Sequence, residues 1–159
     1  MRSAFSPAGW LAVGGVLCLG LLGPCSGAAA AASAPDETPI SLELNKLAPI
    51  AEGAGCRAYF VISNPGAQAM SDLDLDLVLF NAEGIIARRM AVQFGPVPAQ
   101  KTVVRLFDLA GTPCDSIGHI LLNDVLSCQA GATAPGGDSR AACLARITVS
   151  SLAKAKLTR

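Results

Sequence analysis

Three aspartates alternate with leucines in the stretch SDLDLDLVLFNAEG: Asp72, Asp74 and Asp76, followed later by Glu83. Their spacing coincides with positions one, three, five and twelve of a calcium-binding loop, in which carboxylates hold the ion. That loop also needs a glycine at its sixth position, because the backbone turns there through positive φ, and this chain has Leu77. No helical pattern flanks the stretch, so the calcium-loop match fails at both of its structural requirements.

The residues between the aspartates favour a β-strand. They form an unbroken alternate row: Leu73, Leu75, Leu77 and Leu79. On a strand this row is one core-facing stripe, and each buried leucine stabilises the fold by roughly 1.5–3 kcal/mol. The aspartates then lie on the opposite face, where we expect Asp76 to stand opposite Arg89 across an NAEG hairpin turn. A weak cation site on the three aspartates is the alternative; otherwise we predict no metal and no cofactor.

His119 is the only histidine of the chain and the main candidate for a general base. It lies within an expected strand, GHILLND, whose alternation would put Asp124 on the opposite face. No G-x-S-x-G elbow, phosphate-binding glycine loop or C-x-x-C motif is present in the sequence. We therefore predict a non-catalytic protein. The alternative is a small periplasmic hydrolase in which His119 works with an acidic neighbour.

The N-terminus has the pattern of a secretory signal peptide. Arg2 precedes the apolar run WLAVGGVLCLGLL, and the small-residue stretch SGAAAAASA follows it. The run is too short for a comfortable membrane span, and no Arg-Arg pair precedes it. We expect residues 1–34 to be a general secretory signal that is cleaved between Ala28 and Ala34. The mature protein is then periplasmic or secreted, with no stable membrane insertion.

Four cysteines remain after such cleavage: Cys56, Cys114, Cys128 and Cys143. An even number in an exported chain indicates two disulfides, for which three connectivities exist. We favour Cys128–Cys143, because the intervening Gly- and Ala-rich residues resemble a loop between neighbouring strands, and Cys56–Cys114 then follows. A zinc site is disfavoured, because no two cysteines have the usual C-x-x-C spacing.

Alternation of period two continues through most of the chain, and Gly, Pro and Asn mark the breaks. It predicts about seven strands, at 40–47, 56–63, 72–80, 85–94, 102–109, 117–126 and 143–150. We therefore expect a single antiparallel immunoglobulin-like β-sandwich at 40–151, after a flexible lead-in at 35–39 and before a polar tail at 152–159.

The charges are balanced, because removal of Arg2 with the signal leaves 11 basic and 12 acidic residues. This balance argues against nucleic acid or an anionic membrane as a partner. A sandwich offers edge strands as interaction surfaces, and we expect the edges to be 40–47 and 85–94. The predicted partner is another envelope protein, bound through exposed strand residues: Phe80, Arg88, Arg89 and Phe94.

The segment LVLFN, followed by AEG, resembles the F-x-L-Y-D signature of small bacterial immunoglobulin-like domains. Leu79 matches the motif leucine, Phe80 stands for its tyrosine and Asn81 for its aspartate, while Leu77 replaces its phenylalanine. The whole segment 40–150 also resembles small exported proteobacterial proteins with no assigned activity. The resemblance implies the fold and supplies no catalytic residue.

Overall fold

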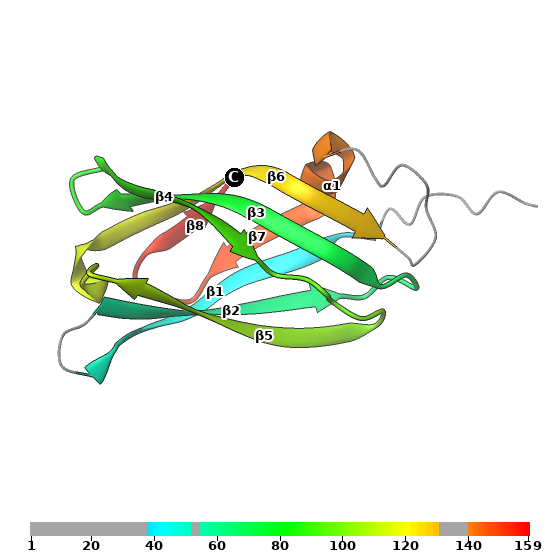
Figure 1. Cartoon of the computed structure of the whole chain (residues 1–159), viewed down its shortest axis with the longest axis horizontal. Helices are drawn as coiled ribbons and strands as arrows, with labels where there is room; N and C mark the ends of the chain where they lie inside the picture. Colours follow the sequence, from blue (N-terminus) through cyan, green and yellow to red (C-terminus); the bar gives the residue numbers. More distant parts are fainter. Residues whose placement is uncertain (1–37, 52–54, 131–139) are drawn as a thin grey trace, which may run out of the picture. The chain divides into compact units, whose positions relative to one another are not determined.

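The structure is a computed structural model that describes residues 38–51, 55–130 and 140–159. Two packed β-sheets of four strands each make up most of these residues, so the predicted all-β sandwich is confirmed (Figure 1). The strands number eight rather than about seven. The predicted signal peptide at 1–34 lies outside the described residues, as does most of the predicted lead-in at 35–39.

Sheet A has the strand order β5-β2-β1-β7, and sheet B has the order β4-β3-β6-β8. The strands of sheet A are β1 (Ile40–Pro49), β2 (Gly55–Asn64), β5 (Lys101–Ala110) and β7 (Ile147–Ser151). The strands of sheet B are β3 (Met70–Asn81), β4 (Ile86–Gln93), β6 (Ile117–Ala130) and β8 (Lys156–Thr158). Two short helices, η2 (Cys114–Ser116) and α1 (Arg140–Arg146), precede β6 and β7.

The strand order follows that of an immunoglobulin domain until its last strand. β1, β2 and β5 pair as strands A, B and E do, and β3 and β6 pair as C and F do in the facing sheet. At the C-terminal end, β7 pairs with β1 in parallel and β8 pairs with β6 in parallel. The prediction of a purely antiparallel sandwich is therefore wrong at these two pairs, because the C-terminal segment contributes one strand to each sheet.

The leucine row of β3 faces the core as predicted. Its four members are between 0% and 2% exposed: Leu73, Leu75, Leu77 and Leu79. A cluster of three aromatic rings fills the same space, with Phe94 5.2 Å from Phe60 and 5.0 Å from Phe107 between ring centroids. Phe94 is fully buried, so its predicted exposure is wrong. It lies just beyond the end of β4, where the chain leaves the edge and turns into the interior.

The C-terminal residues differ from the predicted strand at 143–150 and the predicted polar tail at 152–159. Residues 140–146 form α1, because RAACLAR consists mainly of alanine, arginine and leucine, which are strong helix formers. β8 then pairs with β6, and it buries Leu157. The small Ala155, also buried, gives little hydrophobic signal for this strand. In the described residues, no helix is long and apolar enough to cross a membrane.

Both favoured disulfides are confirmed. Cys56 at the start of β2 is bonded to Cys114 of η2, with 4.9 Å between their Cα atoms. Cys128 of β6 is bonded to Cys143 of α1, with 6.4 Å between their Cα atoms. The first bond joins the two sheets, and the second holds α1 against sheet B. Two disulfides in a chain of this size are typical of an oxidising, extracellular environment.

Loss of Cys56–Cys114 is expected to destabilise the protein more than loss of Cys128–Cys143. In the chain-entropy model, closure of a loop of 58 residues contributes about 4 kcal/mol, against about 3 kcal/mol for one of 15. Urea unfolding of the two Cys→Ala double variants, with the oxidised parent as control, measures both values. Equal losses would contradict the prediction.

Candidate functional site

The hairpin between β3 and β4 sets the position of the acidic row. Asn81 starts the NAEG turn, and its Oδ1 accepts hydrogen bonds from the backbone N–H groups of Glu83 and Ile85. Gly84 takes a φ of 80°, which a side chain would disfavour. The strands pair with Val78 opposite Arg89 and Asp76 opposite Ala91, so the predicted register was two residues off. The shift is even, and Arg89 therefore still lies on the face of Asp76.

Asp76 and Arg89 form the expected ion pair. Arg89 Nη2 lies 2.8 Å from Asp76 Oδ2, and Arg89 Nε lies 2.9 Å from Oδ1. Asn123 Nδ2 of β6 donates a further hydrogen bond to Oδ2 over 2.6 Å. The Asp76 side chain is only 4% exposed, whereas that of Arg89 is 66% exposed. The hydrogen bonds from Arg89 lower the pKa of Asp76, burial opposes them, and Asn123 adds to the lowering.

The cation site on Asp72, Asp74 and Asp76 gains no support from this geometry. Both carboxylate oxygens of Asp76 are already engaged by Arg89 and Asn123. Within the described ranges, no group of three or more His, Cys, Asp or Glu side chains could hold a metal ion. The acidic row is therefore a strand face with one internal ion pair, as the strand interpretation predicts.

His119 packs between β3 and β8. Its ring stacks on Phe80, with 5.0 Å between centroids and 18° between planes, and its Nε2 lies 2.6 Å from Thr158 Oγ1. Asp124 is on the same face of β6, contrary to expectation, because the register against β3 shifts between Asp76 and Leu77. In the part of the chain that is described, His119 forms no ion pair with a carboxylate. This arrangement serves to hold β8 on β6.

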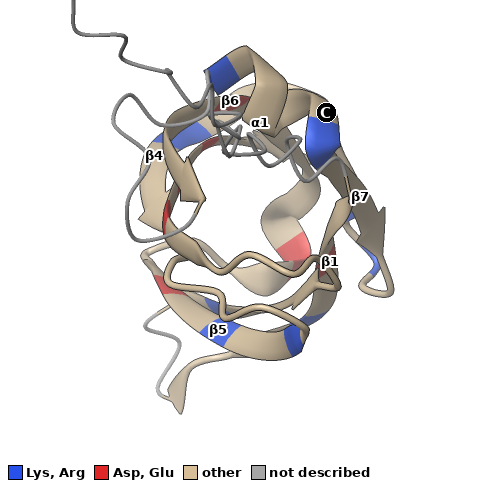
Figure 2. Cartoon of the chain, turned by 90° about the vertical axis from the view of Figure 1, so that its right-hand side faces the viewer, with Lys and Arg blue, Asp and Glu red and all other residues tan. Residues whose placement is uncertain are grey.

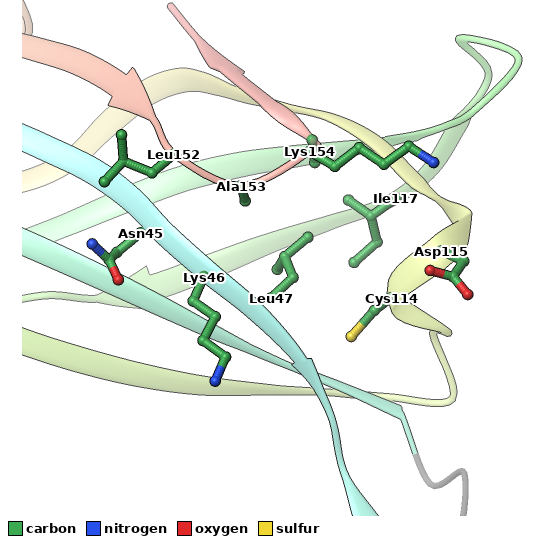
Figure 3. Close-up of a pocket in the computed structure, with 10 residues that line it drawn as sticks. Asn45, Lys46, Leu47, Cys114, Asp115, Ile117, Leu152, Ala153 and Lys154 are labelled. Atoms are coloured by element: carbon green, nitrogen blue, oxygen red, sulfur yellow. The ribbon is translucent and has the colours of Figure 1, made fainter.

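A small cavity opens between β1, η2 and the turn that joins β7 to β8 (Figure 3). Leu47 and Ile117 point toward its interior, while Lys154 and Asp115 stand at its rim. Its volume is about 240 Å³. Small-molecule sites usually measure about 300–1,000 Å³ and hold converging polar groups. This cavity lies below that size range, although polar residues such as Asn45, Lys46 and Asp115 contribute to its lining.

The sheet edges are β5 and β7 in sheet A and β4 and β8 in sheet B. The prediction of an edge at 85–94 is confirmed by β4, but the prediction at 40–47 is wrong. β1 is an inner strand, because β7 returns to pair with its free side. Among these edges, β7 and β8 span only five and three residues. β4 carries Arg88 and Arg89 and has a register shift at its start, between Ile86 and Arg88, and both features protect an edge from pairing.

β5 is the long edge strand. Its ten residues pair with β2 in one unbroken register, without a bulge, and none of them is proline. Val104 and Leu106 on its outer face are 52% and 49% exposed. They lie beside Val61 and Tyr59 of β2, respectively. The four side chains form an exposed apolar block, which we call the outer block, on a strand whose free backbone groups face solvent.

Polar pairs border the outer block on both sides. Arg57 Nε lies 2.6 Å from Asp108 Oδ1, and Thr102 Oγ1 lies 3.0 Å from Ser63 Oγ. The hydrogen bond from Arg57 lowers the pKa of the exposed Asp108 carboxyl, an effect that burial opposes. An apolar centre within a polar rim is the usual composition of a protein–protein interface.

A groove of about 280 Å³ separates β4 from β5. Met90, Val92, Phe107 and Leu109 contribute apolar side chains to its lining. At one end Arg88 Nη1 donates a hydrogen bond to the Ala110 carbonyl oxygen over 3.2 Å. Beyond the residues that line the groove, Arg105 Nη2 on β5 donates to the Pro96 carbonyl oxygen over 2.7 Å. Figure 2 shows basic positions in blue on both strands.

The residues predicted for binding lie in different places. Arg88 is at the groove, Arg89 is engaged by Asp76, Phe80 is stacked on His119, and Phe94 is in the core. The sequence interpretation predicted a strand at 102–109 but did not predict that it is an exposed edge strand. Its signal was present in TVVRLFDL, where valine and leucine occupy both faces of one strand and only one face can be buried.

Comparison with protein-family models, with curated proteins and with solved structures finds no match to this chain. The resemblance to F-x-L-Y-D domains therefore stays a prediction, and the function must be argued from the geometry of the site.

The Arg89→Ala variant is expected to be less stable than wild type at pH 7. It leaves the buried Asp76 carboxylate without its charged partner, and the solvent exposure of Arg89 limits the loss. Because the pKa of Asp76 lies below its ordinary value of 3.8 in the folded protein, the pair stabilises above that value. Its contribution disappears as the pH falls through the folded pKa, so the difference from wild type should shrink there.

Urea unfolding at pH 7 and near pH 3 measures this difference. Arg140→Ala, an exposed arginine on α1, is the matched control and should leave stability nearly unchanged at both values. A loss for Arg89→Ala that is the same at both pH values would show that packing, rather than charge, holds Arg89 in place.

Proposed function

We propose that this protein is an exported, non-catalytic β-sandwich that binds another protein of the cell envelope through edge strand β5. The observation that carries the proposal is the exposure of β5: ten residues in one regular register, with Val104 and Leu106 each about half exposed. An edge strand leaves alternate backbone N–H and C=O groups without a strand partner, although on β5 the carbonyl oxygens of Val104 and Ala110 accept hydrogen bonds from Arg105 and Arg88.

Strand addition uses these groups directly. An extended segment of a partner would extend sheet A from four strands to five, with backbone hydrogen bonds for affinity and alternate side chains for specificity. Its outward side chains would cover Val104 and Leu106, which have apolar neighbours only toward β2. The rim pair of Arg57 and Asp108 would then stay at the border of the interface.

Two features support the exported location. The disulfides Cys56–Cys114 and Cys128–Cys143 require an oxidising compartment to persist. The predicted signal peptide at 1–34 directs the chain to the periplasm or beyond. The compartment in turn restricts the partner to a periplasmic, secreted or envelope-bound protein.

The non-catalytic role is supported by the surroundings of His119. A general base in a triad needs a carboxylate at one ring nitrogen to orient the ring, and in the described residues His119 forms no ion pair with a carboxylate. The pocket beside His119 is lined by Lys156, by Thr158 and by turn residues. None of its lining residues is a carboxylate. His119 serves to pack β8 rather than to move a proton.

Leu106→Lys is expected to weaken capture of the partner about tenfold or more, because it places a charge where the added strand must pack. Ile86→Lys is the matched control, since Ile86 is 63% exposed but lies on the other edge, β4. The tagged, processed protein is cross-linked in its native envelope, and the same partner band is quantified for wild type and both variants. Equal recovery with Leu106→Lys would contradict the proposal.

A second measurement locates the contact in the protein itself. Amide hydrogen exchange of β5 should slow in the captured complex, while exchange of β4 and β7 should stay as in the free protein. Slower exchange on β4 instead of β5 would show that the partner binds edge strand β4, and it would contradict the proposal.

A further inference from the structure

Arg88 lines the groove between β4 and β5, and Arg105 lies further along β5; neither guanidinium group has a carboxylate partner, because Asp108, the acidic residue of the lining, is paired with Arg57. In the described part of the chain only two ion pairs form, Arg57–Asp108 and Arg89–Asp76. Arg88 and Arg105 donate instead to backbone carbonyl oxygens of Ala110, Phe94 and Pro96. Carbonyl oxygens carry no net charge, so each guanidinium group keeps a positive charge that a partner can neutralise.

The two cations are arranged along the strand at a defined spacing. On β5, Val103, Arg105, Phe107 and Leu109 are less exposed than their neighbours and face the space between the sheets. Arg105 is the second residue of this row, and Arg88 reaches its C-terminal end at Ala110. Four residues of strand span about 13 Å. Phe107 lies midway, where its ring contacts Phe94 and forms an apolar floor.

The inward position of Arg105 also limits which strands can pair with β5. A charged side chain that points inward from an edge strand opposes pairing with an arbitrary strand, because the added strand would bury it. The same charge favours a strand that brings a carboxylate to it. The outer block attracts an extended apolar segment, and Arg105 and Arg88 decide which segments are accepted.

We propose that the strand which adds to β5 is an acidic extended peptide segment with the pattern acidic–x–apolar–x–acidic. This proposal rests on the proposed function and specifies its partner. The two carboxylates contact Arg105 and Arg88, and the apolar residue between them covers Phe107 and Met90. The x positions face outward beside Val104 and Leu106 and are therefore β-branched or apolar.

A second copy of this chain is disfavoured in the register that aligns the two outer blocks. Antiparallel pairing of β5 with itself that matches Val104 to Leu106 places Arg105 opposite Arg105. Like charges directly opposite each other destabilise a strand pair. The charges of the groove therefore favour a different chain over self-association.

The test uses the blocked peptide Thr-Val-Glu-Val-Leu-Val-Glu-Val-Thr, which has the proposed pattern and reads the same in both directions. Two further peptides carry Gln or Lys in place of both Glu residues. Each is titrated into the oxidised, isotopically labelled protein, and amide chemical shifts report the position and the affinity of binding. The Glu peptide should perturb the amides of β5 and bind about three- to tenfold more tightly than the Gln peptide, because it forms two rim ion pairs.

Two variants of the protein separate charge from folding. Arg105→Gln and Arg88→Gln should each remove part of the preference for Glu over Gln, and Arg140→Gln on α1 should leave it unchanged. Since Arg105→Gln loses bonds to Phe94 and Pro96, the charge reversal Arg88→Glu provides an independent check. Arg88→Glu should bind the Lys peptide better than wild type does. Added salt should reduce the preference for Glu in the wild-type protein.

The outcomes distinguish the two proposals. Binding of all three peptides at β5 with equal affinity would overturn the acidic pattern and leave strand addition intact. Absence of binding by every peptide at β5 would overturn both. Sedimentation velocity of the free protein completes the test, because a dimer that Leu106→Lys dissociates would show that a second copy occupies β5.

Discussion

The burial of alternate leucines on β3 is the constraint from which the rest of the structure follows. Leu73, Leu75, Leu77 and Leu79 can be removed from water together only if β3 is extended and faces a second sheet. Side chains of even number are then forced to the other face. Asp76 is one of them, and it can be almost completely buried there because Arg89 and Asn123 donate four hydrogen bonds to its carboxylate.

The same architecture creates the candidate site. Two open sheets have four edges, and each must be shortened, bent, charged or covered to avoid indiscriminate pairing. β7 and β8 are short, and β4 carries two arginines beside a register shift. β5 has the length and regularity of an inner strand, with Arg105 as its inward charge. A selective binding edge needs this combination of an open backbone and a charge that most strands cannot accommodate.

The C-terminal end shows how tertiary bonds replace local signals. α1 is too short to be stable by itself, yet Cys143 on α1 is bonded to Cys128 of β6. Beyond it, β7 extends sheet A and β8 extends sheet B, so one short segment covers one edge of each sheet. Only the edges on the side of β4 and β5 then remain long, which directs recognition to that side.

The sequence by itself determined the features that depend on local pattern. These are the strand character of 72–80, the burial of its leucines and the presence of an Asp76–Arg89 pair; for the cysteines the sequence favoured the observed connectivity among three. Period-two alternation and cysteine spacing are local, and an even register shift leaves a residue on the same face.

Only the tertiary structure decided which strands are edges, because that depends on where distant strands return. The return of β7 to β1 made 40–47 an inner strand and left β5 open. Burial of Phe94, the fold of 152–159 and the unpaired charges of Arg88 and Arg105 likewise depend on packing between segments far apart in the chain. No local pattern contains that information.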